Sequence, residues 1–148
     1  MPLRDPQSHA VIGAAFEVNR VLGCGFLEQV YQDALALDFT ERGIPFDRQV
    51  GLRIMFKRRV LPSFYRVDFV CFGELLVELK ASMQILPIDQ AQMINYLKAT
   101  RFERGLLLNF GGRSLEWKRF VFSEDLHAAR SDDLPQAEGV GEETKPQA

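Results

Sequence analysis

Two short apolar runs in the middle of the chain carry ionisable residues where a buried strand should have none. The first run is Val67–Val70, which contains Asp68, and the second is Val77–Ala81, which contains Glu78 and Lys80. A charged side chain on a buried strand is destabilising unless it is paired or binds an ion. The two runs therefore predict neighbouring strands whose charged residues are there for a reason other than stability.

The length of the loop between these strands decides whether their charges meet. Side chains two apart in a strand share a face, so Glu78 and Lys80 point the same way. A two-residue loop would put Asp68 and Glu78 on opposite faces of the sheet, whereas a three-residue loop at 72–74 would pair them directly. Gly73 permits the left-handed backbone that such a loop often needs. We expect the odd-length loop, or a bulge.

The rest of the chain supplies helices and further strands around this pair. Ser8 is the expected N-cap of the first helix, and Gly43 is the expected stop of the second. A three-strand antiparallel meander followed by a crossover helix gives a mixed five-stranded sheet flanked by helices, in the order ααβββαββ and the α/β class. The expected helices span 8–22, 26–42 and 87–100, and the expected strands span 48–56, 65–72, 75–80, 104–110 and 114–122.

Length and composition indicate one domain with a separate tail. The chain has 148 residues, which suits a single core, and no apolar run approaches the ~20 residues of a membrane helix. The first residues lack the apolar segment of a secretory signal, and Cys24 and Cys71 have no metal-ligand spacing. We expect reduced thiols in a cytoplasmic protein, a domain over 1–122, and a disordered acidic tail over 123–148 with one short helical turn near 126–130.

The charges are distributed unevenly between the domain and the tail. The net charge is −2, yet residues 1–122 hold 16 basic and 13 acidic residues, so the domain is mildly basic and can approach a polyanion. Six cations mark the expected hairpin tip and the strands beside it: Lys57, Arg58 and Arg59 at the tip, with Arg48, Arg53 and Arg66. They predict a ribbon that contacts phosphates, and the alternative is a solvated hairpin tip.

The acidic pair suggests metal chemistry. Two carboxylates about 5 Å apart repel each other and favour a divalent cation between them. Oxygen ligands without histidine suit Mg²⁺ or Mn²⁺, and Lys80 would then orient or activate a water molecule at a phosphodiester. The alternative is an acid–lysine ion pair on an edge strand. His9 and His127, the chain's two histidines, are placed where neither a zinc site nor a histidine-based triad is expected.

Two helical pairs add residues to the candidate site. Glu28 and Tyr31 lie one helical turn apart, and Gln92 and Tyr96 have i, i+4 spacing on the helix after the second charged strand. Each has a structural alternative: Glu28 as a first-turn acid favoured by the helix dipole, the tyrosines as residues at the edge of the core, and Gln92 as a solvated position.

These residues belong to a larger set of motifs: Gly25-x-x-Glu28-x-x-Tyr31, Glu41-Arg42-Gly43-Ile44-Pro45, Asp68, Val77-Glu78-Leu79-Lys80-Ala81, Ala91-Gln92-x-x-x-Tyr96-Leu97-Lys98 and Gly105-Leu106-Leu107-Leu108-Asn109-Phe110. Taken together, the motifs resemble the GxxExxY family of the PD-(D/E)xK nuclease superfamily, over about Ile12 to Val121. Val67 stands where the superfamily motif has proline, and Asn19 stands where a histidine is expected.

The resemblance implies a restriction-endonuclease-like core and a set of site residues. Asp68, Glu78 and Lys80 would form the signature triad, Glu28 would be an additional acid near the metal, and Gln92 would support the site from the next helix. The expected function is a metal-dependent nuclease that uses Mg²⁺ or Mn²⁺ and acts on DNA rather than RNA, with a homodimer as the expected assembly. The alternative is a non-catalytic module that keeps the fold and binds nucleic acid or a protein. Nucleic-acid contacts are expected at Tyr31, Tyr96, Lys57, Arg58, Arg59 and Arg66.

Overall fold

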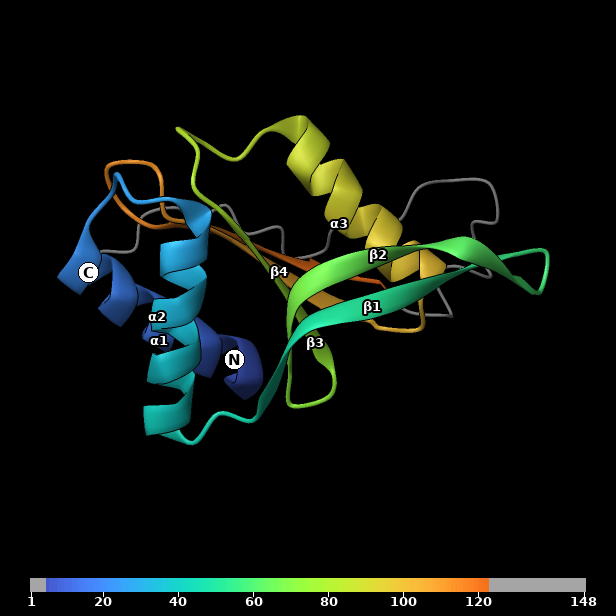
Figure 1. Ribbon diagram of the computed structural model, residues 1–148, viewed down its shortest axis with the longest axis horizontal. Coiled ribbons are helices and arrows are strands. Elements are labelled where there is room, and N and C mark those ends of the chain that lie inside the picture. The colour runs from blue at the N-terminus through green and yellow to red at the C-terminus, as the bar shows by residue number, and fades with distance from the viewer. Residues whose placement is uncertain (1–4, 123–148) are drawn as a thin grey trace.

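A mixed five-stranded sheet separates two helices on one face from a third helix on the other (Figure 1). The computed structural model describes residues 5–122, so the expected acidic tail and its helical turn lie outside the described part of the chain. The elements are α1 (Pro6–Leu22), α2 (Glu28–Arg42), β1 (Phe46–Phe56), β2 (Arg59–Cys71), β3 (Leu75–Lys80), α3 (Pro87–Ala99), β4 (Arg104–Asn109) and β5 (Glu116–Val121).

The predicted fold class and topology are confirmed. The strands lie in the order β1-β2-β3-β4-β5, and every neighbouring pair is antiparallel except β3 and β4, which run parallel. A parallel pair needs a long crossover connection, and α3 provides it. The meander and the crossover place the carboxyl ends of β3 and β4 at the same edge of the sheet, where β3 ends in Lys80.

Apolar side chains fill both faces of the sheet. One core lies between the sheet and the α1–α2 pair and includes Leu79, Phe69 and Phe39, all with no exposed surface. The other lies between the sheet and α3 and includes Leu76 and Met93. Leu79 thus points away from the face that carries α3, as the alternation along β3 predicts. No helix within the described residues is long and apolar enough to cross a membrane.

The first helix begins two residues earlier than its sequence suggests. Asp5, not Ser8, is the N-cap: its Oδ1 accepts the backbone N–H groups of Gln7 and Ser8, both at 3.2 Å, and Pro6 occupies the first turn. An aspartate directly before a proline suits this position, because proline needs no donor at the first helical residue. The prediction of Ser8 as the cap was therefore wrong.

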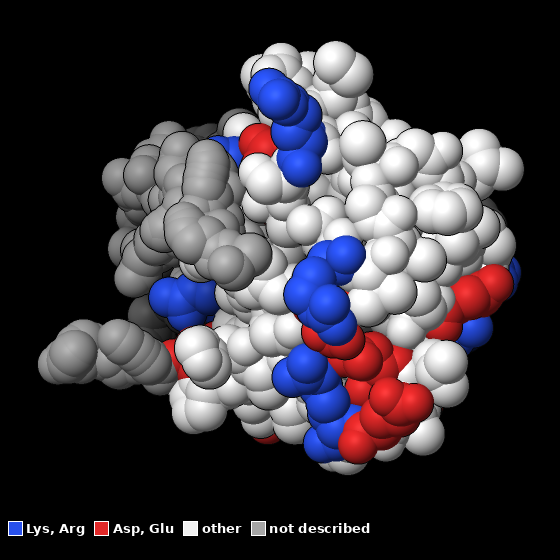
Figure 2. Space-filling model, turned by 90° about the vertical axis from the view of Figure 1, so that its left-hand side faces the viewer, with Lys and Arg blue, Asp and Glu red and all other residues white. Residues whose placement is uncertain are grey.

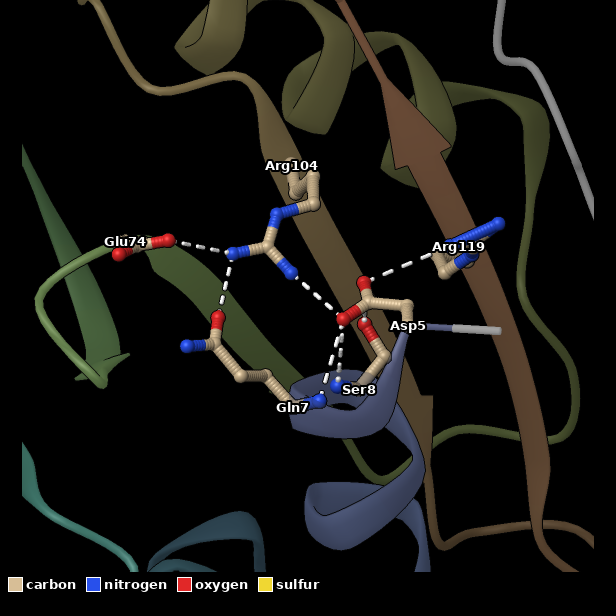
Figure 3. Close-up of polar contacts among 6 residues, drawn as sticks. All are labelled: Asp5, Gln7, Ser8, Glu74, Arg104 and Arg119. Carbon is tan, nitrogen blue, oxygen red and sulfur yellow. Dashed lines mark hydrogen bonds and ion pairs between the residues drawn. The ribbon is translucent and has the colours of Figure 1, made fainter. Parts of the chain in front are cut away.

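Asp5 also fastens α1 to the amino end of β4 (Figure 3). Nη1 of Arg104 lies 2.6 Å from Asp5 Oδ1, and Nη2 of the same guanidinium lies 3.0 Å from Glu74 Oε1. Burial raises the pKa of Asp5, but hydrogen bonds from Ser8 and Arg104 outweigh it and lower that pKa to about 2. The clamp formed by Asp5 and Arg104 thus holds the helical layer at the end of β4 opposite Lys80.

The β1–β2 hairpin is longer than expected. β2 begins at Arg59 rather than near residue 65, because its early residues pair with β1 as far as the turn at Lys57 and Arg58. Pro62 falls where the β1–β2 register shifts, so its missing N–H interrupts no regular ladder. The outer part of the hairpin, residues 51–66, is called the hairpin arm below. Its base packs against α3 through Leu52 and Tyr65, and its far end projects past α3 (Figure 1).

The two cysteines lie in different environments. Cys24 is exposed in the loop between α1 and α2, whereas Cys71 is buried at the end of β2. Burial raises the pKa of the Cys71 thiol to about 12. Neither cysteine is in a disulfide.

Candidate active site

Strands β2 and β3 separate at Asp68 and Glu78. The β2–β3 ladder runs from Cys71–Leu75 to Phe69–Val77, which is the register of a three-residue loop at 72–74 and confirms the expected loop length. The next positions are Asp68 and Glu78, and here side chains replace the backbone ladder. The backbone N–H of Asp68 donates to Glu78 Oε1 at 3.1 Å, and the N–H of Leu79 donates to Asp68 Oδ2 at 2.8 Å.

The opposite side of β2 is irregular at the same point. Gln49 would pair with Asp68, but its φ is +50°, and the β1–β2 register omits this pair. Phe46 lies against the α1–α2 core, whereas Val50 lies against the α3 core, although regular alternation would put both on one face. The faces of the two strands therefore invert at Gln49 and Asp68. A left-handed residue of this kind is strained unless its surroundings hold it.

A buried glutamine on α2 organises this irregular point. Gln32 is 4% exposed, and its Nε2 donates to Asp68 Oδ1 at 3.1 Å. Its Oε1 accepts from Arg48 Nη2 at 2.9 Å and from Gln49 Nε2 at 3.1 Å. Gln49 Nε2 also lies 3.1 Å from Asp68 Oδ1. Gln32 was not among the predicted site residues, although its position one turn after Glu28 on α2 was a usable signal.

The amino ends of α2 and α3 both approach the end of β3. Glu28 is the first residue of α2, and Asp89 lies in the first turn of α3. Nζ of Lys80 lies 3.6 Å from Asp89 Oδ1, while Asp89 Oδ2 accepts the N–H of Leu86 at 2.9 Å. Helix amino ends carry partial positive charge and favour anions. Asp89 is a second residue that the sequence analysis missed.

The three predicted acids all favour the protonated form more than a free carboxyl does. Burial first, and then the charge of Asp68, raise the pKa of Glu78 to about 8. Burial, with the Asp68 charge second, also raises the pKa of Glu28. For Asp68, burial raises the pKa although the N–H of Leu79 and the Gln49 amide act against it. Burial is thus the first cause at all three carboxyl groups, and the charge of Asp68 adds to it at Glu28 and Glu78.

The chemical type of these donors suits a hard divalent cation, but the side chains are not arranged around one common ion position. The donors are carboxylate oxygens without sulfur or imidazole, the type that Mg²⁺ and Mn²⁺ prefer. Within residues 5–122, however, no three acidic, histidine or cysteine side chains lie close enough together to hold one ion. Instead, Asp68 and Glu78 each accept a hydrogen bond from a backbone N–H, and Glu28 accepts one from the N–H of Ala81.

Two tyrosines that were expected near nucleic acid lie in the core. Tyr31 has no exposed surface: its hydroxyl donates to the carbonyl of Gly23 at 2.6 Å, and its ring stacks on Phe110 with centroids 4.8 Å apart. Tyr96 is 4% exposed and packs its ring 4.7 Å from that of Tyr65. Neither ring is accessible to a base, so in this structure both are packing residues.

Gln92 and the basic residues occupy separate places. Gln92 is half-buried on α3, one turn from Asp89, and among the described residues it has no hydrogen bond to the acids. Of the six predicted phosphate-contacting cations, five lie exposed on the hairpin arm: Lys57 and Arg58 in its turn, Arg53 on β1, and Arg59 and Arg66 on β2. The sixth, Arg48, lies outside the arm and pairs with Asp33 at 2.8 Å.

Comparisons with known proteins agree with the fold. The sequence model of the family described as "PD-(D/E)XK nuclease superfamily" matches residues 5–120. A solved structure described as "Crystal structure of SSO0001" superposes with a TM-score of 0.51 at 15% identity. The superposition covers 74% of this chain and 61% of that one, so this chain spans less than two thirds of its length. A search of the curated proteins finds none that matches.

Proposed function

This chain belongs to the PD-(D/E)XK nuclease superfamily, and from that membership we propose that it is a metal-dependent nuclease that hydrolyses phosphodiester bonds in DNA. The observation that carries the proposal is the separation of β2 and β3 at Asp68 and Glu78, where two buried carboxylates replace the backbone ladder. Such an arrangement costs stability, because it holds like charges together in the protein interior. A role in binding a cation explains why the chain keeps it.

Asp68 and Glu78, with Glu28 as a third acid, are the proposed residues for holding Mg²⁺ or Mn²⁺. When bound, such an ion supplies charge neutralisation at the phosphate and a lowered pKa for a coordinated water molecule. The protein's own part is to hold three carboxylates at the end of β3 and to limit the water around them. Gln32 and Gln49 fix the orientation of the Asp68 carboxylate through its Oδ1.

Lys80 is the proposed partner of the attacking water. Its side chain lies on the same face of β3 as that of Glu78. Its ammonium group forms an ion pair with Asp89 at 3.6 Å, a distance at which the contact is weak. It can therefore donate to a water molecule or to a phosphate oxygen without breaking a short bond. Positive charge at this position also stabilises the charge that develops on phosphorus. Gln92, half-buried on α3, is proposed to support the same region.

We also propose a narrower family, a cellular location and an oligomeric state for this protein. The Gly25-x-x-Glu28-x-x-Tyr31 motif supports membership of the GxxExxY family within the superfamily. Its Tyr31 has a structural part, since its hydroxyl holds the loop that leads into Glu28. We propose a cytoplasmic location, since Cys24 and Cys71 are free thiols. We also propose a homodimer, because a single domain of this size offers little surface to a duplex.

A cleavage assay tests the proposal directly. Wild-type protein would be incubated with single-stranded, duplex and branched DNA and with RNA, in Mg²⁺ or Mn²⁺, beside Lys80→Ala purified identically. Cleavage by the wild type, lost with the variant and with chelation of the metal, is the expected result. Lys98→Ala is the matched control, because Lys98 is an exposed lysine on α3.

Equal cleavage by wild type and Lys80→Ala would show a contaminant or a different site and would refute the assignment of Lys80. If both proteins bind nucleic acid and neither cleaves any substrate in the panel, a non-catalytic binding module replaces the nuclease.

A further inference from the structure

The hairpin arm carries five cations and no acid. Residues 51–66 contain Arg53, Lys57, Arg58, Arg59 and Arg66 and neither aspartate nor glutamate, in a chain whose net charge is −2. All five side chains are exposed, and none of them takes part in an ion pair with the described residues. The arm is thus a strongly positive projection whose charge is not neutralised by the folded domain.

The helical side of the molecule shows the opposite arrangement. Arg20, Arg42 and Arg48 each lie within 3 Å of a carboxylate, at 2.8, 2.6 and 2.8 Å respectively. Figure 2 shows the face on the left of Figure 1, and on its lower half the basic and acidic side chains adjoin one another. Cations are therefore paired where α1 and α2 lie and left unpaired on the arm.

The turn of the arm has an unusual sequence for its geometry. Lys57 and Arg58 have φ of +49° and +68°, and they join β1 to β2 as a two-residue loop. Hairpin loops of this kind strongly favour Asn-Gly, because both positions need a left-handed backbone. Two cations here do not serve local stability. An observed backbone outlier of this type points to function.

Aromatic rings rather than carboxylates lie under the arm's cations. The Lys57 ammonium is 5.4 Å from the centre of the Phe56 ring, and the Arg66 guanidinium is 5.7 Å from that of Phe64. Arg53 pairs with Phe64 across the two strands, and Arg66 pairs with Gly51, so two arginines and one aromatic ring share a face. Phe56 and Phe64 are 57% and 55% exposed. This combination of cations and flat apolar surface suits phosphates and base edges.

We propose that the hairpin arm binds duplex DNA as a two-stranded ribbon in the major groove, with its turn gripping the backbone. The inference rests on the proposed function, since it assumes a nucleic-acid substrate, and it adds the form of that substrate. The major groove of B-form DNA is about 12 Å wide and admits a two-stranded ribbon, whereas the corresponding groove of duplex RNA is too narrow. The arm therefore selects DNA duplexes over RNA duplexes.

The arm and the acidic site belong to the same strand. Arg66 precedes Asp68 by two residues, and Arg59, the first residue of β2 after the turn, precedes it by nine. At ~3.3 Å per residue, the turn is about 30 Å from Asp68 along the strand, which corresponds to roughly nine base pairs at ~3.4 Å each. Duplex DNA that extends less than this distance beyond the site cannot reach the turn.

The test measures binding without cleavage. Dissociation constants for a labelled DNA duplex and an RNA duplex of the same sequence would be measured across a salt series, in chelator, for the wild type and for Lys57→Asn/Arg58→Gly. That variant removes two charges and installs the most favourable turn sequence, so we expect its melting temperature to be equal or higher. On duplex DNA its salt slope, −dlogK/dlog[salt], falls by about 1.8, corresponding to two lost phosphate contacts. On duplex RNA the two proteins bind alike.

Arg20→Gln/Arg42→Gln is the matched control, because it removes two cations from the helical side. A control that lowers the slope as much as the arm variant overturns the inference, since net charge would then explain the binding. An unchanged slope for the arm variant, or an equal loss on RNA, also overturns it. So does a wild-type dimer that the arm variant converts to monomer without changing DNA binding, because the arm would then contact a second copy.

The binding experiment and the cleavage assay can fail independently of each other. If the protein binds DNA through the arm but cleaves no substrate, the proposed nuclease activity is refuted and the proposed role of the arm in DNA binding is supported. Cleavage by a protein whose DNA binding ignores the arm refutes this inference alone.

Discussion

Gln32 of α2 donates a hydrogen bond to Asp68 of β2 at 3.1 Å, across 36 residues of sequence. This contact joins the helical layer to the point where β2 departs from regular pairing. The same side chain accepts hydrogen bonds from Arg48 and Gln49, so one amide satisfies groups from two strands. A buried amide with this many partners has few substitutes, because Gln offers both a donor and an acceptor at the same reach.

Gln32→Ala should destabilise the protein by about 2 kcal/mol, because it leaves buried polar groups without partners. Urea unfolding followed by circular dichroism measures the change. Gln29→Ala is the control: Gln29 lies on the same helix, is exposed, and should cost less than ~0.5 kcal/mol. Equal effects of the two substitutions would mean that Gln32 contributes nothing beyond helix surface.

Glu78→Gln should abolish cleavage while making the protein more stable at alkaline pH. Folded Glu78 keeps its proton up to a pKa of about 8, whereas the unfolded chain releases it near 4.5. Between these values the folded state binds more protons, so raising the pH favours unfolding of the wild type, by on the order of 5 kcal/mol over the window. Glutamine keeps an Oε1 acceptor for the Asp68 N–H and carries no charge.

The measurement is the unfolding free energy of both proteins from pH 5 to pH 8.5 in chelator. The two curves should nearly meet at the acidic end and diverge as the pH rises, with the variant above the wild type. Parallel curves would show that Glu78 titrates normally in the folded protein.

Divalent cations should raise the melting temperature of the wild type at pH 8, and much less at pH 5. Ligand carboxylates must be ionised, and at the lower pH Glu78 retains its proton. At a concentration one hundred times the dissociation constant the stabilisation is about 2.7 kcal/mol. Differential scanning fluorimetry with Mg²⁺, with Mn²⁺, and with NaCl at matched ionic strength measures it. A shift of the same size in Glu78→Gln would place the ion elsewhere.

Tyr31→Phe should lower stability by about 1–2 kcal/mol and reduce cleavage. The hydroxyl donates to the carbonyl of Gly23 and accepts the N–H of Phe26, which fixes the loop leading into Glu28. Tyr65→Phe is the control, since among the described residues its hydroxyl has no hydrogen bond. If Tyr31→Phe keeps full activity and stability, the hydroxyl has no part in holding the loop.

Local patterns predicted the sheet and the meeting of its acids. The period-two alternation places Leu79 opposite in direction to Glu78, and Gly73 allows the three-residue loop, with φ of +69°. Both signals lie within ten residues of each other, so they need no knowledge of the tertiary structure. The early start of α1 also had a local signal, the Asp5-Pro6 pair, which the choice of Ser8 as the cap overlooked.

The surroundings of the acids could not be predicted in the same way. Asp89 meets Lys80 only because α3 packs with its amino end at the end of β3. The inversion of faces at Gln49 contradicts the alternation that the sequence shows, and it depends on contacts from α2 that hold a left-handed glutamine. Long-range packing determines both the Asp89–Lys80 contact and the inversion at Gln49, and local sequence patterns do not reveal such packing.

The carboxyl groups at the two ends of the β3–β4 pair have pKa values shifted in opposite directions. Asp5, at the clamp, stays ionised down to a pKa of about 2, while Glu78, at the other end, takes up its proton near 8. Between these limits, mild acid protonates Glu78 without weakening the attachment of α1. A crystal grown at pH 5 would therefore hold an intact fold with Glu78 protonated, and transfer of that crystal to alkaline buffer would ionise Glu78 within the same lattice.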